Sequence, residues 1–323
     1  MSFYGGYFEL ELGSGREYHK NCLRLNSGRN ALEYVIKQRE YMKIYLPYYT
    51  CDVMLNPIHR LGIEFEHYRI NRELLPEFAF EGLGANEAIV ITNYFGLLDE
   101  YVESLANCKH NIIIDNAQAF YAKPITGIDT FYSPRKFFGV PDGAYLYLGN
   151  NYGELALYHE LEHDTSWDRC SHLIKRADNL VEEGYANFRS LSAIYKELPL
   201  RKMSILSSRI LDSIEYNVVR ARRRENFRIV DSVLGSRNQL KSSLDSDSVP
   251  MAYPFLSSRT DLRDRLIKQG VFIPQYWANV TLLSGKGSWE SELAENLIAL
   301  PIDQRYNEPQ VYAMLEIIKQ CLA

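Results

Sequence analysis

Three short segments in the first half of the chain carry side chains that could act together at one site. The first is LNSGRNAL (25–32), in which a Ser-Gly turn enters a predicted helix. Free backbone N–H groups and the positive end of the helix dipole at such a turn favour a phosphate group. Ser27, Gly28 and Arg29 are therefore candidate phosphate-binding residues, although many helices begin in this way without binding a ligand.

The second segment is NIIIDNAQAF (111–120), which places Asp115 at the carboxyl end of a predicted buried strand. Open α/β sheets bind their ligands at this end of the strands. Gln118 follows three residues later and would lie close enough to contact the same ligand. In an alternative role, Asp115 would cap the N-terminus of a helix that follows the strand.

The third segment is FYSPRKFFGVPDGAYL (131–146), in which Lys136 lies among aromatic and apolar neighbours. Such surroundings destabilise the charged form of a lysine and favour the nucleophilic free amine that forms Schiff bases. In the alternative interpretation, the stem of Lys136 is covered and its ammonium group reaches the solvent.

The elements that would position these segments alternate between strands and helices. Ser27 is a suitable N-cap for the helix that follows it, and continuous apolar runs predict strands buried on both faces. We predict strands at 43–49, 63–70, 88–96, 111–115 and 144–148, with helices after Ser27, before Gly62 and at 98–107. This β-α-β order predicts an α/β fold with a doubly wound, mostly parallel sheet.

The remainder of the chain is predicted to be mostly helical from 155 to 235, with a break at Pro199, and then to form a small α+β unit. We predict strands at 252–256 and 271–277, a helix at 260–270, a last helix ending at Ala323, and a surface loop at 241–248. The N-terminal GGYFELEL (5–12) alternates like an edge strand that could bring Tyr7 or Phe8 toward the site.

The composition is that of a globular protein with a full core, since 46% of the 323 residues are hydrophobic and 24% are charged. The net charge of −5 gives no reason to expect a nucleic-acid or membrane partner. The five cysteines are scattered, which suits a reducing compartment, and the N-terminus lacks the features of a signal peptide. We therefore expect a cytoplasmic protein without disulfides or a structural zinc site.

The order of these motifs resembles that of the DegT/StrS-type sugar aminotransferases, within the fold-type I enzymes that use pyridoxal 5′-phosphate (PLP). The chain reads SGRNAL, DNAQ, SPRK and PDGA in sequence, followed by RKMSILSS (201–208) and IALPIDQRYNEPQV (298–311). The resemblance covers nearly the whole chain. It implies a large PLP-binding domain over residues 1–215 and a small α+β domain over 216–323.

The resemblance also implies a role for each candidate residue. Lys136 would hold PLP as a Schiff base and move a proton between substrate and cofactor. Asp115 would keep the pyridine nitrogen protonated, and Gln118 would hydrogen-bond the phenolic oxygen of the ring. The phosphate would be held by Ser27, Gly28 and Arg29.

The chain departs from the family pattern at three positions. Cys51 of PYYTC (47–51) occupies the position of the aromatic residue that stacks on the cofactor ring, so Tyr49 is the expected substitute. Phe131 occupies the position of a phosphate-binding serine, for which Ser133 or Arg135 could compensate. Leu200 aligns with an asparagine that reaches the phosphate of a neighbouring subunit.

The function implied by the resemblance is transfer of an amino group from an amino acid to a keto sugar, expected to be nucleotide-linked, by a homodimer. A lyase or dehydratase that uses the same cofactor is one alternative. A non-catalytic binding or assembly protein that keeps the fold is another, and the loss of the serine and the asparagine motivates it.

Two further motifs have simpler explanations. HELEH (159–163) matches the H-E-x-x-H zinc pattern, which would place His159 and His163 on one face of a helix with Glu160 as general base. Its acidic surroundings favour an exposed helix that matches the pattern by chance. The basic run RARRRENFR (220–228) is flanked by apolar residues and predicts a solvated helix face rather than a nucleic-acid site.

Overall fold

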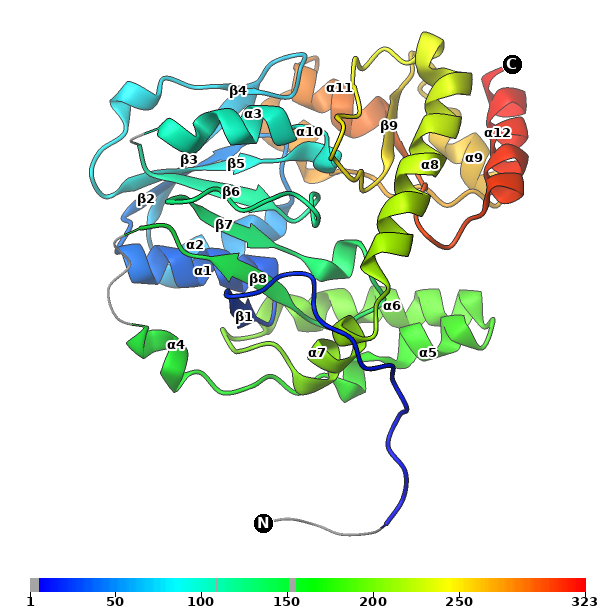
Figure 1. Cartoon of the computed structure of the whole chain (residues 1–323). Coiled ribbons are helices and arrows are strands. Elements are labelled where there is room, and N and C mark those ends of the chain that lie inside the picture. The colour runs from blue at the N-terminus through cyan, green and yellow to red at the C-terminus, as the bar shows by residue number, and fades with distance from the viewer. Residues whose placement is uncertain (1–5, 109, 151–154) are drawn as a thin grey trace.

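The computed structural model describes residues 6–108, 110–150 and 155–323. Within them, eight strands form one mixed sheet in the order β1-β8-β7-β6-β5-β2-β3-β4 (Figure 1). The strands are β1 (Leu23–Leu25), β2 (Lys43–Pro47), β3 (Glu64–Ile70), β4 (Pro76–Glu77), β5 (Glu87–Thr92), β6 (Ile112–Asn116), β7 (Asp129–Tyr132) and β8 (Ala144–Tyr147). The central strands β3, β2, β5, β6 and β7 are parallel, whereas β1, β4 and β8 are antiparallel to their neighbours. The predicted α/β architecture is confirmed, although β1, β4 and β7 were not predicted.

The central strands are buried on both faces. In β6, Ile113 packs into the core on one face, while Ile112 and Ile114 pack into the core on the other, as the alternation of side chains along a strand requires. The first face is covered by α1 (Gly28–Arg39) and α2 (Leu55–Leu61), and α3 (Asp99–Ser104) lies on the second.

Helix α1 begins where the sequence predicts. The Ser27 Oγ accepts a hydrogen bond from the Asn30 N–H at 3.3 Å, which satisfies one of the free donors of the first turn. The helix ends at Glu40, whose left-handed backbone (φ 56°) stops the helical hydrogen bonds.

Helices dominate the middle of the chain, and Pro199 interrupts them as predicted. They are α4 (Ala156–Glu160), α5 (Ser171–Ala177), α6 (Val181–Glu197), α7 (Ile205–Asp212) and α8 (Tyr216–Leu234). Helices α5 and α6 pack against each other as a hairpin (Figure 1). Helix α8 connects two cores, because Tyr216 and Val219 pack beside the sheet while Phe227 and Val230 pack with the C-terminal elements.

The C-terminal elements form a small α+β unit. They are β9 (Tyr253–Leu256), α9 (Leu262–Lys268), α10 (Asn279–Ser284), α11 (Trp289–Asn296), β10 (Leu297–Leu300) and α12 (Glu308–Leu322). The strand predicted at 271–277 is wrong: β10 pairs with β9 instead. Val271 and Ile273 are buried and Phe272 is exposed, so the alternation reflects burial on one side of an unpaired segment. Pro274, which has no N–H to donate, also disfavours strand pairing.

The described part of the N-terminal segment joins no strand, so the predicted edge strand is wrong for residues 6–12, and residue 5 lies outside the described residues. Tyr7 and Phe8 are 99% and 94% exposed, and the segment projects away from the sheet (Figure 1). Glu9 forms an ion pair with Arg209 of α7. Neither aromatic residue approaches the candidate site.

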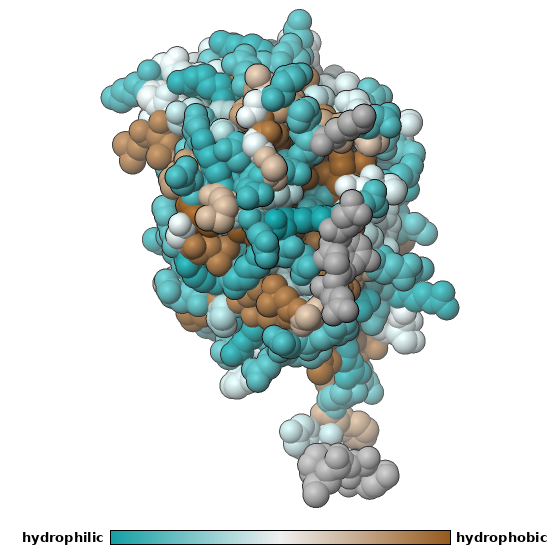
Figure 2. Space-filling view, turned by 90° about the vertical axis from the view of Figure 1, so that its left-hand side faces the viewer, coloured by the Kyte–Doolittle hydropathy of each residue, from teal (hydrophilic) through white to brown (hydrophobic). Residues whose placement is uncertain are grey.

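The distribution of polar and apolar residues on the surface is typical of a globular protein. One face is mostly hydrophilic, with small separate hydrophobic patches (Figure 2). All five cysteines are free. Among the helices that the structure describes, none is both long and apolar enough to cross a membrane. The predicted loop at 241–248 has no regular secondary structure.

A buried carboxylate joins the turn after Lys136 to α7. Asp142 is fully buried and accepts hydrogen bonds from the Ser204 N–H at 2.8 Å, the Ser204 Oγ at 2.6 Å and the Ser207 Oγ. We predict that Asp142→Ala lowers the free energy of unfolding by on the order of 3 kcal/mol or more, because it leaves buried donors without acceptors. Chemical denaturation of the purified variant measures this. Asp178→Ala removes an exposed carboxylate and is the control, and an equally small loss in both variants would contradict the prediction.

Candidate active site

A cavity of about 120 Å³ lies at the carboxyl ends of β5 and β6 and brings the three predicted segments together. Its walls include Ser27, Gly28 and Arg29 from the start of α1, Asp115 and Gln118 from the end of β6 and the turn after it, and Lys136. Parallel strands end at the same edge of a sheet, so residues that follow β5, β6 and β7 are brought close together.

Asp115 is a buried residue of the cavity wall. It is 6% exposed, and its Oδ1 accepts a hydrogen bond from the Ala117 N–H at 2.8 Å. Burial raises the pKa of Asp115 to about 6, against the opposing effects of the Ala117 hydrogen bond and the positive charge of Lys136. A turn rather than a helix follows β6, so Asp115 does not cap a helix. Its carboxylate is placed to bind a cationic group of a ligand.

Gln118 is held with its amide nitrogen available. Its Oε1 accepts a hydrogen bond from the Phe95 N–H at 2.9 Å, and its Nε2 has no hydrogen-bond partner among the described residues. The side chain is 3% exposed and lines the cavity. It can therefore donate a hydrogen bond to a ligand oxygen.

Two arginines line the cavity, Arg29 from the first turn of α1 and Arg135 from the turn before Lys136. The Nη1 of Arg29 is buried and has no hydrogen-bond partner, and Arg135 lines the same cavity with its guanidinium 3.8 Å from the Tyr195 ring centroid. Neither arginine forms an ion pair with a described residue. Burial lowers the pKa of both, and each guanidinium lies close enough to other positive charges to be disfavoured by them. An anion bound here would satisfy these donors and relieve the repulsion.

Lys136 ends a single turn of 3-10 helix (Pro134–Lys136) between β7 and β8. Phe137 and Phe138 enter the core, whereas Lys136 is exposed and its Nζ lies 5.3 Å from the centroid of the Tyr276 ring. The expectation that aromatic and apolar neighbours surround the Lys136 amine is therefore wrong. Successive residues of the turn point in different directions, so the burial of the two phenylalanines does not bury the lysine. Lys136 lines both the small cavity and an adjoining cavity of about 770 Å³.

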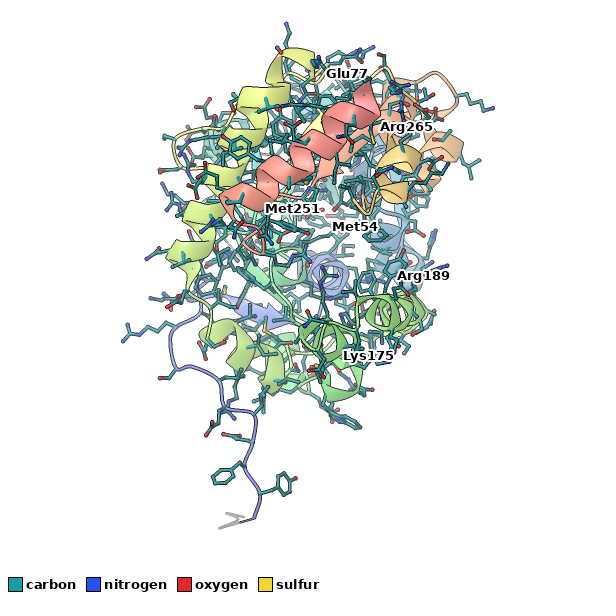
Figure 3. The ribbon with its side chains drawn as sticks, turned by 90° about the vertical axis from the view of Figure 1, so that its right-hand side faces the viewer. Met54, Glu77, Lys175, Arg189, Met251 and Arg265 are labelled. Atoms are coloured by element: carbon teal, nitrogen blue, oxygen red, sulfur yellow. The ribbon has the colours of Figure 1, made fainter. Side chains whose placement is uncertain are left out.

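Two labelled methionines show where the two cavities lie in Figure 3. Met54, which lines the small cavity, and Met251, which lines the large one, lie near the centre of this view. The C-terminal helices lie above them, and the α5–α6 hairpin, marked by Lys175 and Arg189, lies below.

Backbone contacts that sequence reasoning missed hold the site together. The Asn26 carbonyl accepts from the Gly143 N–H at 2.8 Å, and the Asn26 side chain reaches the Pro199 carbonyl. Gly143 has φ of +126°, and a Cβ there would lie 3.1 Å from Met203 and Pro134. The glycine of the PDGA turn is therefore required for this close approach.

The aromatic side chain in the cavity wall is not the one predicted. Tyr49 is fully buried beneath Trp277, with ring centroids 5.1 Å apart, and does not line the cavity. Trp277 does line it, together with Cys51. The predicted stacking role of Tyr49 therefore has no support in this arrangement.

The other departures from the family pattern have clear locations. Phe131 is fully buried in the cavity wall, and a Cβ on Gly28 would lie 3.7 Å from its ring. Ser133 lines the cavity, so it remains available to a phosphate. Leu200 packs against the core under α1 and does not line the cavity.

The H-E-x-x-H pattern does not form a zinc site. Helix α4 ends at Glu160, so His159 and His163 do not share a helix, and the His163 Nδ1 is hydrogen-bonded to the Met203 carbonyl at 2.8 Å. Among the residues that the structure describes, no cluster of potential ligands could hold a metal ion.

The basic run on α8 was predicted to be a solvated helix face, and this is wrong for Arg223, which is buried, whereas Arg228 is exposed. Arg223 is 1% exposed and donates to the carbonyls of Pro250, Met251 and Phe137. Arg224 donates to the carbonyl oxygens of Asp245 and Ser248. Arg223 and Arg224 therefore brace the connection between the two cores.

No family model matches the sequence, and no curated protein matches it by sequence. Solved structures do match. DesV of S. venezuelae, in complex with a ketimine intermediate, is 14% identical with a TM-score of 0.66, over 93% of this chain and 84% of its own. PseC of Helicobacter pylori, an aminotransferase involved in the biosynthesis of pseudoaminic acid, is 13% identical with a TM-score of 0.63, over 94% and 86%. A DegT DnrJ EryC1 StrS aminotransferase from Brucella abortus is 14% identical with a TM-score of 0.60, over 93% and 86%.

This chain has the fold of the DegT/StrS-type sugar aminotransferases. At such low identity the likeness concerns the fold, and the chemistry must be judged from the cavity itself. The cavity of this aminotransferase-type fold fits PLP: Asp115 can face a protonated ring nitrogen, Gln118 Nε2 can donate to a ring oxygen, and Arg29 has an unpartnered donor for a phosphate.

Proposed function

We propose that this chain is a PLP-dependent aminotransferase that moves an amino group from an amino acid to a keto sugar. The observation that carries the proposal is the meeting of Asp115, Lys136 and the start of α1 around one cavity. The fold likeness adds support, since a structurally similar protein of Streptococcus pneumoniae has been solved in a PLP-form and a PMP-form. When bound, PLP supplies an electron sink for the carbanion that forms when a proton leaves the substrate carbon.

The residues of the chain have separate tasks in this proposal. Lys136 Nζ would hold the cofactor covalently and would move the proton at the substrate carbon. The ionised carboxylate of Asp115 stabilises the proton on the ring nitrogen. Arg29, Ser133 and Arg135 bind the phosphate with the backbone N–H groups of α1.

The large cavity supports a nucleotide-linked acceptor. It is lined by Arg135, Lys136, Arg176, Arg223 and Arg305, and Asp303 is the one carboxylate among its described lining residues. Arg305 pairs with Asp303, Arg223 donates to carbonyl groups, and Arg135 is assigned to the cofactor phosphate, so Arg176 is the arginine of this wall that keeps its charge for the acceptor. Aromatic side chains such as Phe188 and Phe272 in the same wall suit a flat or sugar ring.

The test is a pair of half-reactions on the purified, PLP-loaded protein. An amino acid donor should bleach the yellow colour of the bound cofactor, and a nucleotide-linked keto sugar should restore it. The same keto sugar without its nucleotide is the matched control and should restore it less efficiently. Release of ammonia without a second substrate would favour a lyase or dehydratase, and a protein that takes up no PLP would favour a non-catalytic role.

The phosphate site gives a separate prediction. We expect Arg29→Met and Arg135→Met each to weaken PLP binding by about 10- to 100-fold, the value of one or more charged hydrogen bonds. Binding of pyridoxal, which lacks the phosphate, should change little in the same variants. Fluorescence titration with both compounds measures this, and equal losses for PLP and pyridoxal would argue against a phosphate role.

We also propose a homodimer. The α5–α6 hairpin exposes Ile174, Tyr185, Phe188 and Ile194, which are 47–62% exposed in the single chain. Exposed apolar residues gathered on one hairpin suit a protein interface. Light scattering on the purified protein tests the assembly state.

A further inference from the structure

The cavity that Asp115 and Lys136 line also has in its wall an aromatic side chain from the C-terminal part of the chain. Trp277 lies in the irregular segment between α9 and α10 and lines this cavity. Among the described lining residues, the other aromatic side chain is Phe131, which packs beside Gly28 at the start of α1. Of these two rings, Phe131 lies at the end of the cavity where the phosphate is proposed to bind, and Trp277 does not.

Trp277 is supported from behind by buried rings. Its ring centroid lies 5.1 Å from that of Tyr49, which is fully buried and lies 5.5 Å from Tyr94. The Tyr94 hydroxyl in turn donates to the Tyr49 carbonyl at 2.7 Å. Trp277 itself is only partly buried, so it keeps surface that a ligand in the cavity can contact.

The segment that carries Trp277 is also tied to the cavity wall. The Asn279 Nδ2 donates to the Thr50 carbonyl at 3.1 Å, and the Val280 N–H donates to the Trp277 carbonyl at 3.1 Å. The preceding residue, Tyr276, lines the large cavity beside Lys136. Tyr276 thus lines the large cavity and Trp277 the small one, and Lys136 lines both.

Small side chains leave room in the cavity for a flat ring. Cys51 and Ala117 line the same space as Trp277, and neither fills it with a ring of its own. Aromatic rings attract each other in offset-stacked or edge-to-face arrangements, beyond the area they bury. An electron-poor pyridine ring with its nitrogen near Asp115 would find an electron-rich indole as a partner.

We propose that Trp277 packs on the ring of the cofactor and is the residue that fixes the plane of the ring. This inference rests on the proposed PLP function. It makes Trp277 a positioning residue, supported by Tyr49, that holds the ring where Asp115 and Lys136 reach it. It also makes the cofactor site depend on the C-terminal part of the chain.

Tryptophan fluorescence tests the contact directly, because the chain has three tryptophans. The double variant Trp167→Phe/Trp289→Phe leaves Trp277 as the single emitter, and its emission should be strongly quenched by one equivalent of 4′-deoxypyridoxine 5′-phosphate, which has no aldehyde. The variant Trp167→Phe/Trp277→Phe leaves Trp289, which packs under Arg72 outside the cavity, and its emission should change little. Equal quenching in both variants, or none in the first, would overturn the proposal.

Affinity gives a second, independent measurement. Trp277→Leu should raise the Kd for PLP by about 3- to 10-fold, as expected for loss of one aromatic pair, and Trp277→Phe should restore most of it. Trp289→Phe is the matched control and should leave the Kd unchanged. If the wild-type chain binds no PLP, the proposed function fails; if it binds PLP and Trp277→Leu has the wild-type Kd, this inference alone fails.

Discussion

Replacing Lys136 with alanine is expected to abolish covalent capture of PLP and to lower turnover by at least about 10²–10⁴-fold, the usual contribution of a positioned proton-transfer group. The reason is that Lys136 is the lysine that lines the cavity with Asp115. The measurement is borohydride reduction of the PLP-treated protein, followed by mass analysis of the chain. The wild-type chain should carry one stable adduct on Lys136, and the variant should carry none.

Two lysine variants control this experiment. Lys136→Arg keeps the positive charge but should also lose the adduct, which separates the need for a free amine from the need for charge. Lys123→Ala removes a lysine that is 73% exposed and should leave the adduct and the turnover unchanged. A stable adduct of the same yield on Lys136→Ala would show that the proposed nucleophile is wrong.

Asp115→Asn is expected to lower activity by roughly 10²–10³-fold, the cost of removing one preorganised electrostatic partner of a developing charge. The same variant should stabilise the cofactor-free protein. The pKa of the buried Asp115 is raised from 3.8 to about 6, so the folded state disfavours the ionised carboxylate. At pH 7 and above this disfavours folding by about 3 kcal/mol, since one unit of pKa is worth about 1.4 kcal/mol.

The pH dependence of this stabilisation follows from the sign of the pKa shift. An acid with a raised pKa in the folded state loses protons more readily when the chain unfolds, so its penalty is complete above the folded pKa of about 6 and absent below the unfolded value of 3.8. The stability gained by Asp115→Asn should therefore shrink as the pH falls from 7 through 6 toward 4. Denaturation of the cofactor-free proteins across this range measures it.

A second buried carboxylate provides the contrasting control. Asp129 is 3% exposed and forms a 2.7 Å ion pair with Arg39 of α1. Asp129→Asn should destabilise the protein, because it removes the partner of a largely buried cation. If Asp115→Asn destabilises the cofactor-free chain as Asp129→Asn does, Asp115 is a structural residue and its proposed functional role is lost.

Where local chemistry was decisive, the elements could be predicted from the sequence. Ser27 begins α1 because its own hydroxyl caps the first turn, and β5 and β6 are apolar runs that only a doubly covered sheet can bury. The prediction failed at 271–277, where buried and exposed residues alternate but the segment does not pair with a strand. Residues 271–277 alternate because one side packs on the C-terminal core, but β10 takes the place beside β9.

In the candidate site, too, residues marked by local sequence could be predicted and residues placed by distant contacts could not. Asp115 and Gln118 could be singled out because they follow a predicted buried strand at the edge where open α/β sheets bind ligands. Lys136 was singled out by its apolar neighbours and by the order of the motifs, and it lines the same cavity. Trp277 could not be singled out, because nothing in its own segment indicates contact with residues of the N-terminal half. Arg135 was considered only as a compensating residue, and its place in the cavity wall beside Arg29 becomes visible only in the tertiary structure.

The sequence by itself determined the alternation of the main strands and helices around the site, several of the residues that line the cavity and the edge of the sheet at which they meet, since these depend on local caps, periodicity and strand direction. Only the tertiary structure decided which aromatic ring lines the cavity, that Lys136 is exposed to two cavities, and that the pKa of Asp115 is raised to about 6. These properties depend on burial and on contacts between distant segments, which arise only when the C-terminal elements pack against the sheet.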